Sequence, residues 1–184
     1  NTTGAQNTAV GQNALLSNTT ASYNTAVGKN ALDANTTGTA NVAVGYAALG
    51  ASTTNDNNTA VGYSALVNNT TGTQNNAFGR DALPNCTTGN GNVAVGKGAG
   101  SETTTGGFNV FVGAGTRPEA AGNSQTIVIA TIGGNPVAGK GANTGFINPN
   151  GGHCFQGNNA TAWSQVSDER LKKNIVNNDV GLAK

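Results

Sequence analysis

The chain has 184 residues, of which 36% are hydrophobic, 5% aromatic and 9% charged, and its formal net charge is +1 at pH 7. So small a positive charge provides no basic surface for nucleic acid, and so few aromatic residues cannot form a base-stacking platform. The apolar residues are mainly Ala and Val, which argues against a single large globular core.

A repeat of 17 residues dominates the sequence, because glycines recur at that spacing from Gly11 to Gly113. Aligned on these glycines, the units read NTAVGQNALLSNTTASY, NTAVGKNALDANTTGTA and onward, with Asn at position one, Val or Phe at four and Gly at five. Positions eight and nine are usually Ala and Leu. Seventeen residues fit one solenoid coil of two short strands and two turns. We therefore predict an all-β fold in which residues 1–125 form a parallel β-solenoid, or β-roll, of seven 17-residue coils.

Each unit position has an expected role in its coil. The Gly should form a tight corner, because glycine adopts positive φ at little cost. The Val at position four and the Leu at position nine should stack as a thin apolar ladder, and the recurrent Asn should form side-chain amide ladders. In the sixth and seventh units, Gly100 and Arg117 replace the Leu, which is typical of a terminal capping repeat.

The NTAVG…AL…NTTG units resemble the repeats of phage tail-fibre proteins. More distantly they are similar to the head repeats of trimeric autotransporter adhesins, which are left-handed parallel β-rolls wound as trimers. One or two large apolar residues per coil are too few for a free-standing solenoid, so we expect association through the small Ala/Val face. The resemblance implies that the assembly is a homotrimer.

Residues 126–162 form the second predicted region, a Gly-rich connector or knob. It begins with TIVIATI, which reads as one buried strand and is far shorter than the about 20 residues that cross a bilayer. The single His of the chain, His153, stands beside Cys154 without the spacing of a metal site. We predict no metal, no cofactor, no membrane insertion and no nucleic-acid partner, and we assign no role to Cys86 or Cys154.

Residues 163–184 form the third region, where the sequence becomes densely charged: seven of the 17 charged residues lie in the last 17 positions. Ser167 is a good helix N-cap, and Asp168 and Glu169 suit the positive end of a helix dipole. Leu171 and Ile175 lie one helical turn apart. On the residues alone, this segment is a short helix beginning at the C-terminus, with no chemistry.

The longer phrase WSQVSDERLKKNI closely resembles the opening of the intramolecular chaperone domain of phage tail spikes and fibres, including endosialidase spikes. The pattern S-D-x-R-x-K-x-N-I is present in full from Ser167 to Ile175. In that family the domain trimerises, assists folding of the fibre and is released by self-cleavage at the Ser–Asp junction. Only 17 residues follow Ser167, so this region is expected to be the junction and a truncated start of the chaperone.

The resemblance also implies catalytic residues. Ser167 would supply the nucleophilic hydroxyl, and Lys172 would take its proton if partial burial lowers the lysine pKa. Asp168 would orient the junction or simply cap the helix. The activity is at most that of a single-turnover, self-cleaving serine endopeptidase of the Ser–Lys type in the full-length parent protein.

These observations predict a structural, trimeric segment of a phage tail fibre that takes part in host attachment and is cut at Ser167–Asp168. The expected partners are two further copies, other tail or fibre proteins, and a host cell-surface receptor such as a glycan. The location would be the virion tail fibre, outside the cell, after assembly in the host cytoplasm. The alternative is a bacterial trimeric surface adhesin head without enzymatic activity. The Thr-Thr columns also suggest a further alternative, an ice-binding solenoid. The absence of recurrent Asp argues against calcium-binding repeats.

Overall fold

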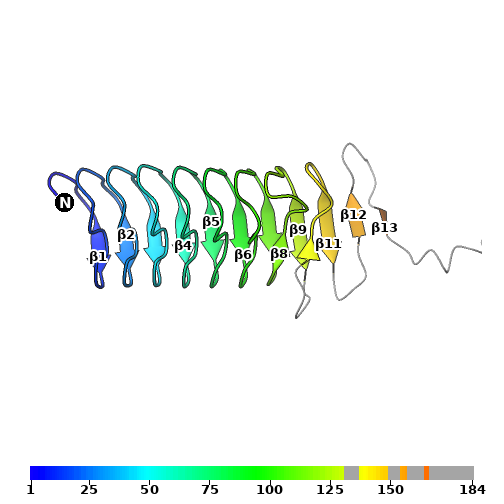
Figure 1. Ribbon diagram of the computed structural model, residues 1–184, viewed down its shortest axis with the longest axis horizontal. Coiled ribbons are helices and arrows are strands. Elements are labelled where there is room, and N and C mark those ends of the chain that lie inside the picture. Colours follow the sequence, from blue (N-terminus) through cyan, green and yellow to red (C-terminus); the bar gives the residue numbers. More distant parts are fainter. Residues whose placement is uncertain (131–136, 149–153, 157–163, 166–184) are drawn as a thin grey trace, which may run out of the picture.

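The computed structural model describes residues 1–130, 137–148, 154–156 and 164–165. These residues form a parallel β-solenoid of about eight turns and contain no helix. Figure 1 shows the strands side by side along one long axis, from β1 at one end to β11 near the other. The all-β solenoid prediction is confirmed, and the predicted C-terminal helix lies outside the described residues.

Each coil contributes one short strand to a single long sheet. Neighbouring strands from β1 to β11 pair in parallel, with Thr25 opposite Val42 and each later partner one unit further on. The last two strands join antiparallel. The strands are β1 (Thr8–Val10), β2 (Thr25–Val27), β3 (Val42–Val44), β4 (Thr59–Val61), β5 (Asn76–Phe78), β6 (Val93–Val95), β7 (Val110–Val112), β9 (Ile127–Ala130), β11 (Gly145–Asn148), β12 (Cys154–Gln156) and β13 (Ser164–Gln165).

The side of the coil opposite this sheet consists mostly of turns, so the expectation of two strands per coil was wrong. In the described residues, a second sheet occurs only where β8 (Thr116–Arg117) pairs with β10 (Val137–Ala138). Earlier coils instead hold their Leu in the left-handed region, with φ of 52° at both Leu49 and Leu66. The N–H of Leu49 still donates to the carbonyl of the next coil, that of Ala65, at 3.0 Å. Packing and this bond together compensate the backbone strain.

The glycine at position five is required for two reasons. Its φ is positive, 140° at Gly62, as the predicted corner demands. In addition, a Cβ at Gly62 would lie 2.4 Å from the carbonyl oxygen of Gly79 in the next coil. The corner prediction is confirmed, and the close approach of successive coils explains why the repeat keeps this residue.

The interior of the solenoid is narrow and is lined by small side chains. The alanines at positions three and eight and the leucines at position nine are buried in successive coils, as Ala60, Ala65 and Leu66 illustrate. The prediction for Leu is confirmed. The predicted single ladder of Val and Leu was wrong: alternation along the strand turns position three inward and positions two and four outward, so the Val column lies on the outer face and the Leu column inside.

Buried asparagines form the predicted amide ladders. At position one, the Oδ1 of Asn24 accepts from the N–H of Asn41 at 2.9 Å. The Nδ2 of Asn24 donates to the carbonyl of Gly38 at 2.8 Å. The same pair of bonds recurs at Asn41 and Asn58. Each of these position-one amides therefore has partners in a neighbouring turn or coil, which removes most of the cost of burying it.

The last glycine-marked coils fill the interior differently. Gly100 stands at the Leu position, and the next coil has the buried Phe111 where earlier coils have Ala. A Cβ at Gly100 would lie 2.7 Å from Cδ2 of Leu83 and 2.9 Å from Cδ2 of Phe111. The Phe111 ring and the Leu83 side chain thus together occupy the volume that a Leu would take. These coils do not cap the solenoid, because β9 pairs with β7 and β11 pairs with β9.

Candidate functional site

The three residues predicted to be catalytic, Ser167, Asp168 and Lys172, lie outside the described residues. The structure therefore neither brings them together nor separates them. Two surface features of the solenoid are candidate functional sites in their place: an apolar sheet face and a row of aromatic and cationic side chains along one edge.

The first feature is the outer sheet face, formed by positions two and four of the strands. Alternation along each strand points these side chains away from the interior. Several apolar members are well exposed, including Phe78 at 42% and Ile127 at 41%. The face consists of Thr25, Val27, Val42, Val44, Thr59, Val61, Asn76, Phe78, Val93, Val95, Val110, Val112, Ile127 and Ile129. It contains no charged residue, and such uncharged apolar surfaces are typical of contact areas.

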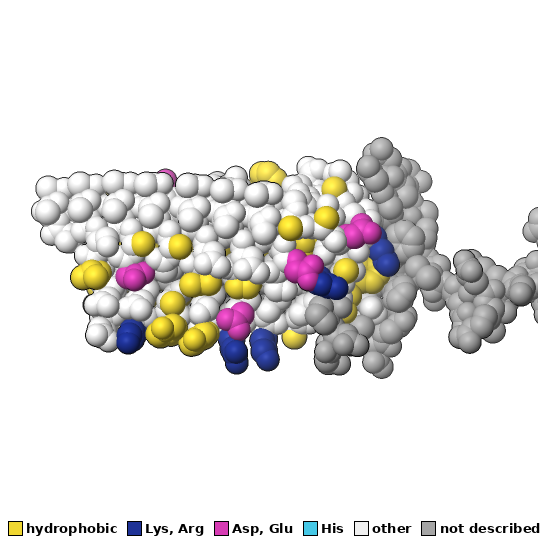
Figure 2. Space-filling model, viewed as in Figure 1, with side chains coloured by type: hydrophobic (Ala, Val, Ile, Leu, Met, Phe, Trp, Pro, Cys, Tyr) yellow, Lys and Arg dark blue, Asp and Glu magenta, His cyan; other side chains and the backbone are white. Residues whose placement is uncertain are grey.

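The second feature is the edge row, at position six of five successive coils. The parallel register places equivalent positions of neighbouring coils next to one another, about 4.8 Å apart. The row consists of Lys29, Tyr46, Tyr63, Arg80 and Lys97. Figure 2 shows cationic and hydrophobic side chains gathered along the lower edge, whereas most of the face in view is uncharged and polar.

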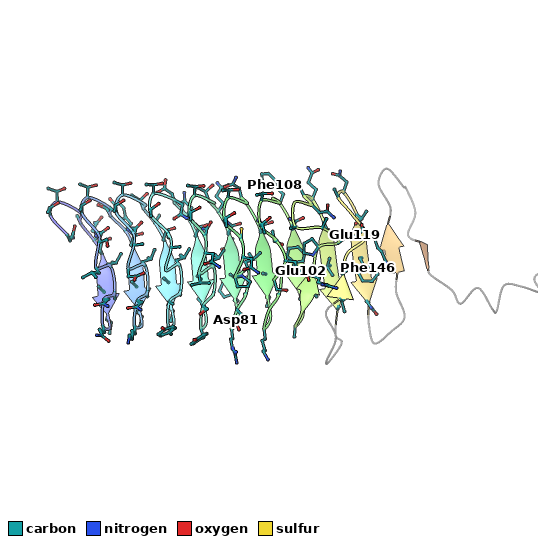
Figure 3. The ribbon with its side chains drawn as sticks, viewed as in Figure 1. Asp81, Glu102, Phe108, Glu119 and Phe146 are labelled. Carbon is teal, nitrogen blue, oxygen red and sulfur yellow. The ribbon has the colours of Figure 1, made fainter. Side chains whose placement is uncertain are left out.

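The centre of the edge row is ordered by direct contacts. The rings of Tyr46 and Tyr63 stack with centroids 5.0 Å apart and planes 13° apart. The Cζ of Arg80 lies 5.8 Å from the Tyr63 centroid, and its Nε donates to Oδ2 of Asp81 at 2.9 Å. A shallow, open depression of about 320 Å³ is lined by Tyr63 and Arg80. Figure 3 places Asp81 at this edge, across the solenoid from Phe108.

Other charged side chains near the far end of the solenoid have partners. Arg117 forms an ion pair with Glu102, and Nζ of Lys140 lies 5.4 Å from the Phe146 centroid. Figure 3 shows Glu119 and Phe146 toward this end, and Glu102 between them and Asp81 along the axis. Neither contact involves a residue of the edge row.

Cys86 is buried in the coil and has no disulfide partner. Burial raises the pKa of its thiol to about 11, and a backbone hydrogen bond of Gly89 has a smaller, lowering effect. A thiol that stays protonated is a poor nucleophile and metal ligand. Across the described residues there is no cluster of three His, Cys, Asp or Glu that could hold a metal, and no helix long and apolar enough to cross a membrane.

Sequence reasoning did not identify the edge row, although the signal was present. It compared residues along each unit, whereas function on a solenoid is arranged across units. Reading position six down the alignment gives Lys, Tyr, Tyr, Arg and Lys in consecutive coils. This column could have been recognised without coordinates, because the period already placed those residues side by side.

Comparison of the chain with protein-family models, with curated proteins and with solved structures finds no match in any of the three. A function must therefore be inferred from the geometry of the chain and from its sequence motifs.

Proposed function

We propose that the chain is a structural segment of a trimeric phage tail fibre that holds a host-binding apparatus outside the virion. The segment acts as a rod, and its partners are two further copies and other tail or fibre proteins. In the parent protein, the chaperone domain that follows Ser167 would be released by self-cleavage at the Ser167–Asp168 bond after assembly. Ser167 would supply the hydroxyl and Lys172 would accept its proton.

The outer sheet face is the observation that supports assembly. The interior of most coils holds only small alanines, one leucine and short polar side chains, so little apolar surface is buried within a single chain. The outer face holds the remaining β-branched side chains in uncharged columns that cross the coils. Burying these columns against equivalent columns of other copies would add the apolar contact that a single solenoid lacks.

Lysine substitutions test this assembly. We expect the combined change Val44→Lys and Val61→Lys to dissociate the trimer, because it would bury two unpaired charges at the contact. Thr37→Lys and Thr71→Lys are matched controls on an exposed column elsewhere in the coil. Sedimentation should show trimers for the wild type and the control, and monomers for the face variant. A face variant that sediments with the wild type would contradict the proposed contact.

Self-cleavage is tested in the full-length parent protein. Ser167→Ala should leave the chain uncut, and Lys172→Ala should leave it uncut or slow its cleavage, as measured by intact mass after denaturation. Ser164→Ala is a matched control three residues earlier and should be cut normally. Cleavage of Ser167→Ala at the wild-type rate would contradict the assigned role.

A further inference from the structure

We infer that the edge row is a binding site for an acidic glycan, a linear oligosaccharide that carries carboxylates. The site would use the tyrosines to contact sugar rings and the cations to hold carboxylates. All five residues come from one chain, so the inference does not depend on the proposed trimer or on self-cleavage. It goes beyond the proposed rod function by placing a ligand on the side of the rod.

The central side chains of the edge row are already held in place before any ligand binds. Tyr46 and Tyr63 are fixed by their mutual stacking, and Arg80 is fixed over Tyr63 by the ring and by Asp81. Both rings are nevertheless about half exposed, at 43% and 52%. Ligand binding would therefore not have to order these side chains, which lowers its entropic cost.

The cationic side chains of the edge row have few ion-pair partners. Asp81 accepts a hydrogen bond from Nε of Arg80. The two Nη groups of Arg80 have no ion-pair partner among the described residues. A guanidinium held in this way presents a planar fork that suits a carboxylate. Lys29 and Lys97, near the two ends of the row, likewise form no ion pair within the described part of the chain. Three cations thus face solvent with a single carboxylate beside them.

The edge row is long and open to solvent. From Lys29 to Lys97 the row covers four coil steps, about 19 Å, which matches an extended oligomer better than a single small molecule. The depression beside Tyr63 and Arg80 is at the lower end of the volumes of small-molecule sites and is open to solvent. An open groove of this kind suits one unit of a chain that continues in both directions.

Single-stranded nucleic acid is the competing polyanion, and the geometry disfavours it. Bases bind by stacking on free aromatic faces. Here Tyr46 and Tyr63 contact each other at 5.0 Å and Arg80 lies over Tyr63, so consecutive bases cannot each stack on a free ring face. A sugar ring needs only one exposed part of a ring, and both tyrosines are about half exposed. The net charge of +1 also gives little general attraction to phosphates.

The coil itself does not require these side chains. Gln12 and Ala114 occupy the same unit position in the first and seventh units. Arg80→Gln and Tyr63→Ala therefore introduce residues that the repeat already accepts there, so both variants should fold. This tolerance separates a binding role from a structural one.

The test is titration of the full chain, by calorimetry and by the ring resonances of its tyrosines, with short oligogalacturonate and oligosialate. The methyl esters of both oligomers are the neutral controls, and an oligothymidylate of similar length is the nucleic-acid control. Arg80→Gln and Tyr63→Ala are compared with Lys140→Gln, another exposed cation beside an aromatic ring. Circular dichroism verifies that each variant is folded.

We expect saturable binding of at least one acidic oligomer, and at least tenfold weaker binding of its methyl ester and of oligothymidylate. Arg80→Gln and Tyr63→Ala should each weaken binding about tenfold or more, the loss of one charge-assisted hydrogen bond or ring contact, whereas Lys140→Gln should not. The inference would be overturned by no saturable binding of either acid, by equal binding of the ester, by tighter binding of oligothymidylate, or by equal effects of Arg80→Gln and Lys140→Gln.

Discussion

Two stretches of the solenoid fill the same interior in different ways. In the coils that contain Leu49, Leu66 and Leu83, a leucine at position nine is surrounded by alanines. Where Gly100 interrupts this column, the aromatic ring of Phe111 enters from position three of the following coil. The volume is conserved while its source in the sequence changes.

This difference shows that the packing unit is a pair of adjacent coils rather than one repeat. Leu at position nine and Ala at position three satisfy the interior together, as do Gly at nine and Phe at three in the next coil. A repeat that seems degenerate when it is aligned alone can therefore be fully packed in the stack.

Removing the ring should have the largest effect. Phe111→Ala leaves a cavity beside Gly100 and should lower the free energy of unfolding by about 3–5 kcal/mol. Adding Gly100→Leu should recover part of this loss, because the φ of 68° at Gly100 is close to that of the leucines in other coils, although Leu83 must move from its 2.7 Å approach to the added Cβ. Chemical denaturation of both single variants and the double variant measures the coupling. Additive single and double changes would show that the two positions do not share one space.

Breaking the feature that both stretches share should cost nearly as much. Gly62→Ala combines a φ that side chains rarely adopt with a Cβ placed against the Gly79 backbone, so we expect a loss of about 3 kcal/mol. Gly98→Ala should cost much less, because its φ of 64° resembles that of Ser64 and Asp81 at the same unit position and nothing lies within 4 Å of the added Cβ. Thermal unfolding at fixed chain concentration compares them. Similar losses would contradict the argument from coil spacing.

A smaller local substitution interrupts the amide ladder at position twelve. Ser52 donates to Oδ1 of Asn55, and Oδ1 of the buried Asn35 has no partner among the described residues. Ser52→Asn together with Asn55→Gly restores the pairing of other coils and should stabilise the fold by about 1–2 kcal/mol. Ser52→Asn alone should destabilise it, because Asn55 still occupies the space. Stabilisation by Ser52→Asn alone would contradict this explanation.

The last effect appears only at alkaline pH and concerns Cys86. Because its pKa is raised to about 11 from 9.0, the unfolded thiol ionises before the folded one as pH rises. Folding therefore loses stability between about pH 9 and 11, by at most about 1.4 kcal/mol per pH unit. Cys86→Ala should lack this slope when unfolding is measured across that range. Identical slopes for the two chains would show that Cys86 does not titrate in this way.

Much of the fold could be predicted because the 17-residue period was regular. The glycine spacing predicted the solenoid, the corner and the buried Leu, and the recurrent Asn predicted the amide ladders. Val44 and its equivalents were expected to stack with Leu in one ladder, because both residues are large and apolar. Alternation along a three-residue strand decides instead that the small Ala at position three points inward.

Other features could not be predicted from unit composition. Intrinsic preferences argue against buried leucines with positive φ, and only stacking against neighbouring coils stabilises them there. The exchange of Leu for Phe111 crosses a unit boundary, as does the edge row. The predicted catalytic residues Ser167, Asp168 and Lys172 lie outside the described residues and stay a prediction.

Native mass spectrometry of the intact chain tests the proposed assembly most directly. The account predicts three copies per particle, because the outer sheet face needs equivalent faces to cover it. Denatured mass in the same experiment shows whether each chain ends at Ser167 or continues beyond it. A monomer at micromolar concentration, with the solenoid folded, would contradict the trimeric rod.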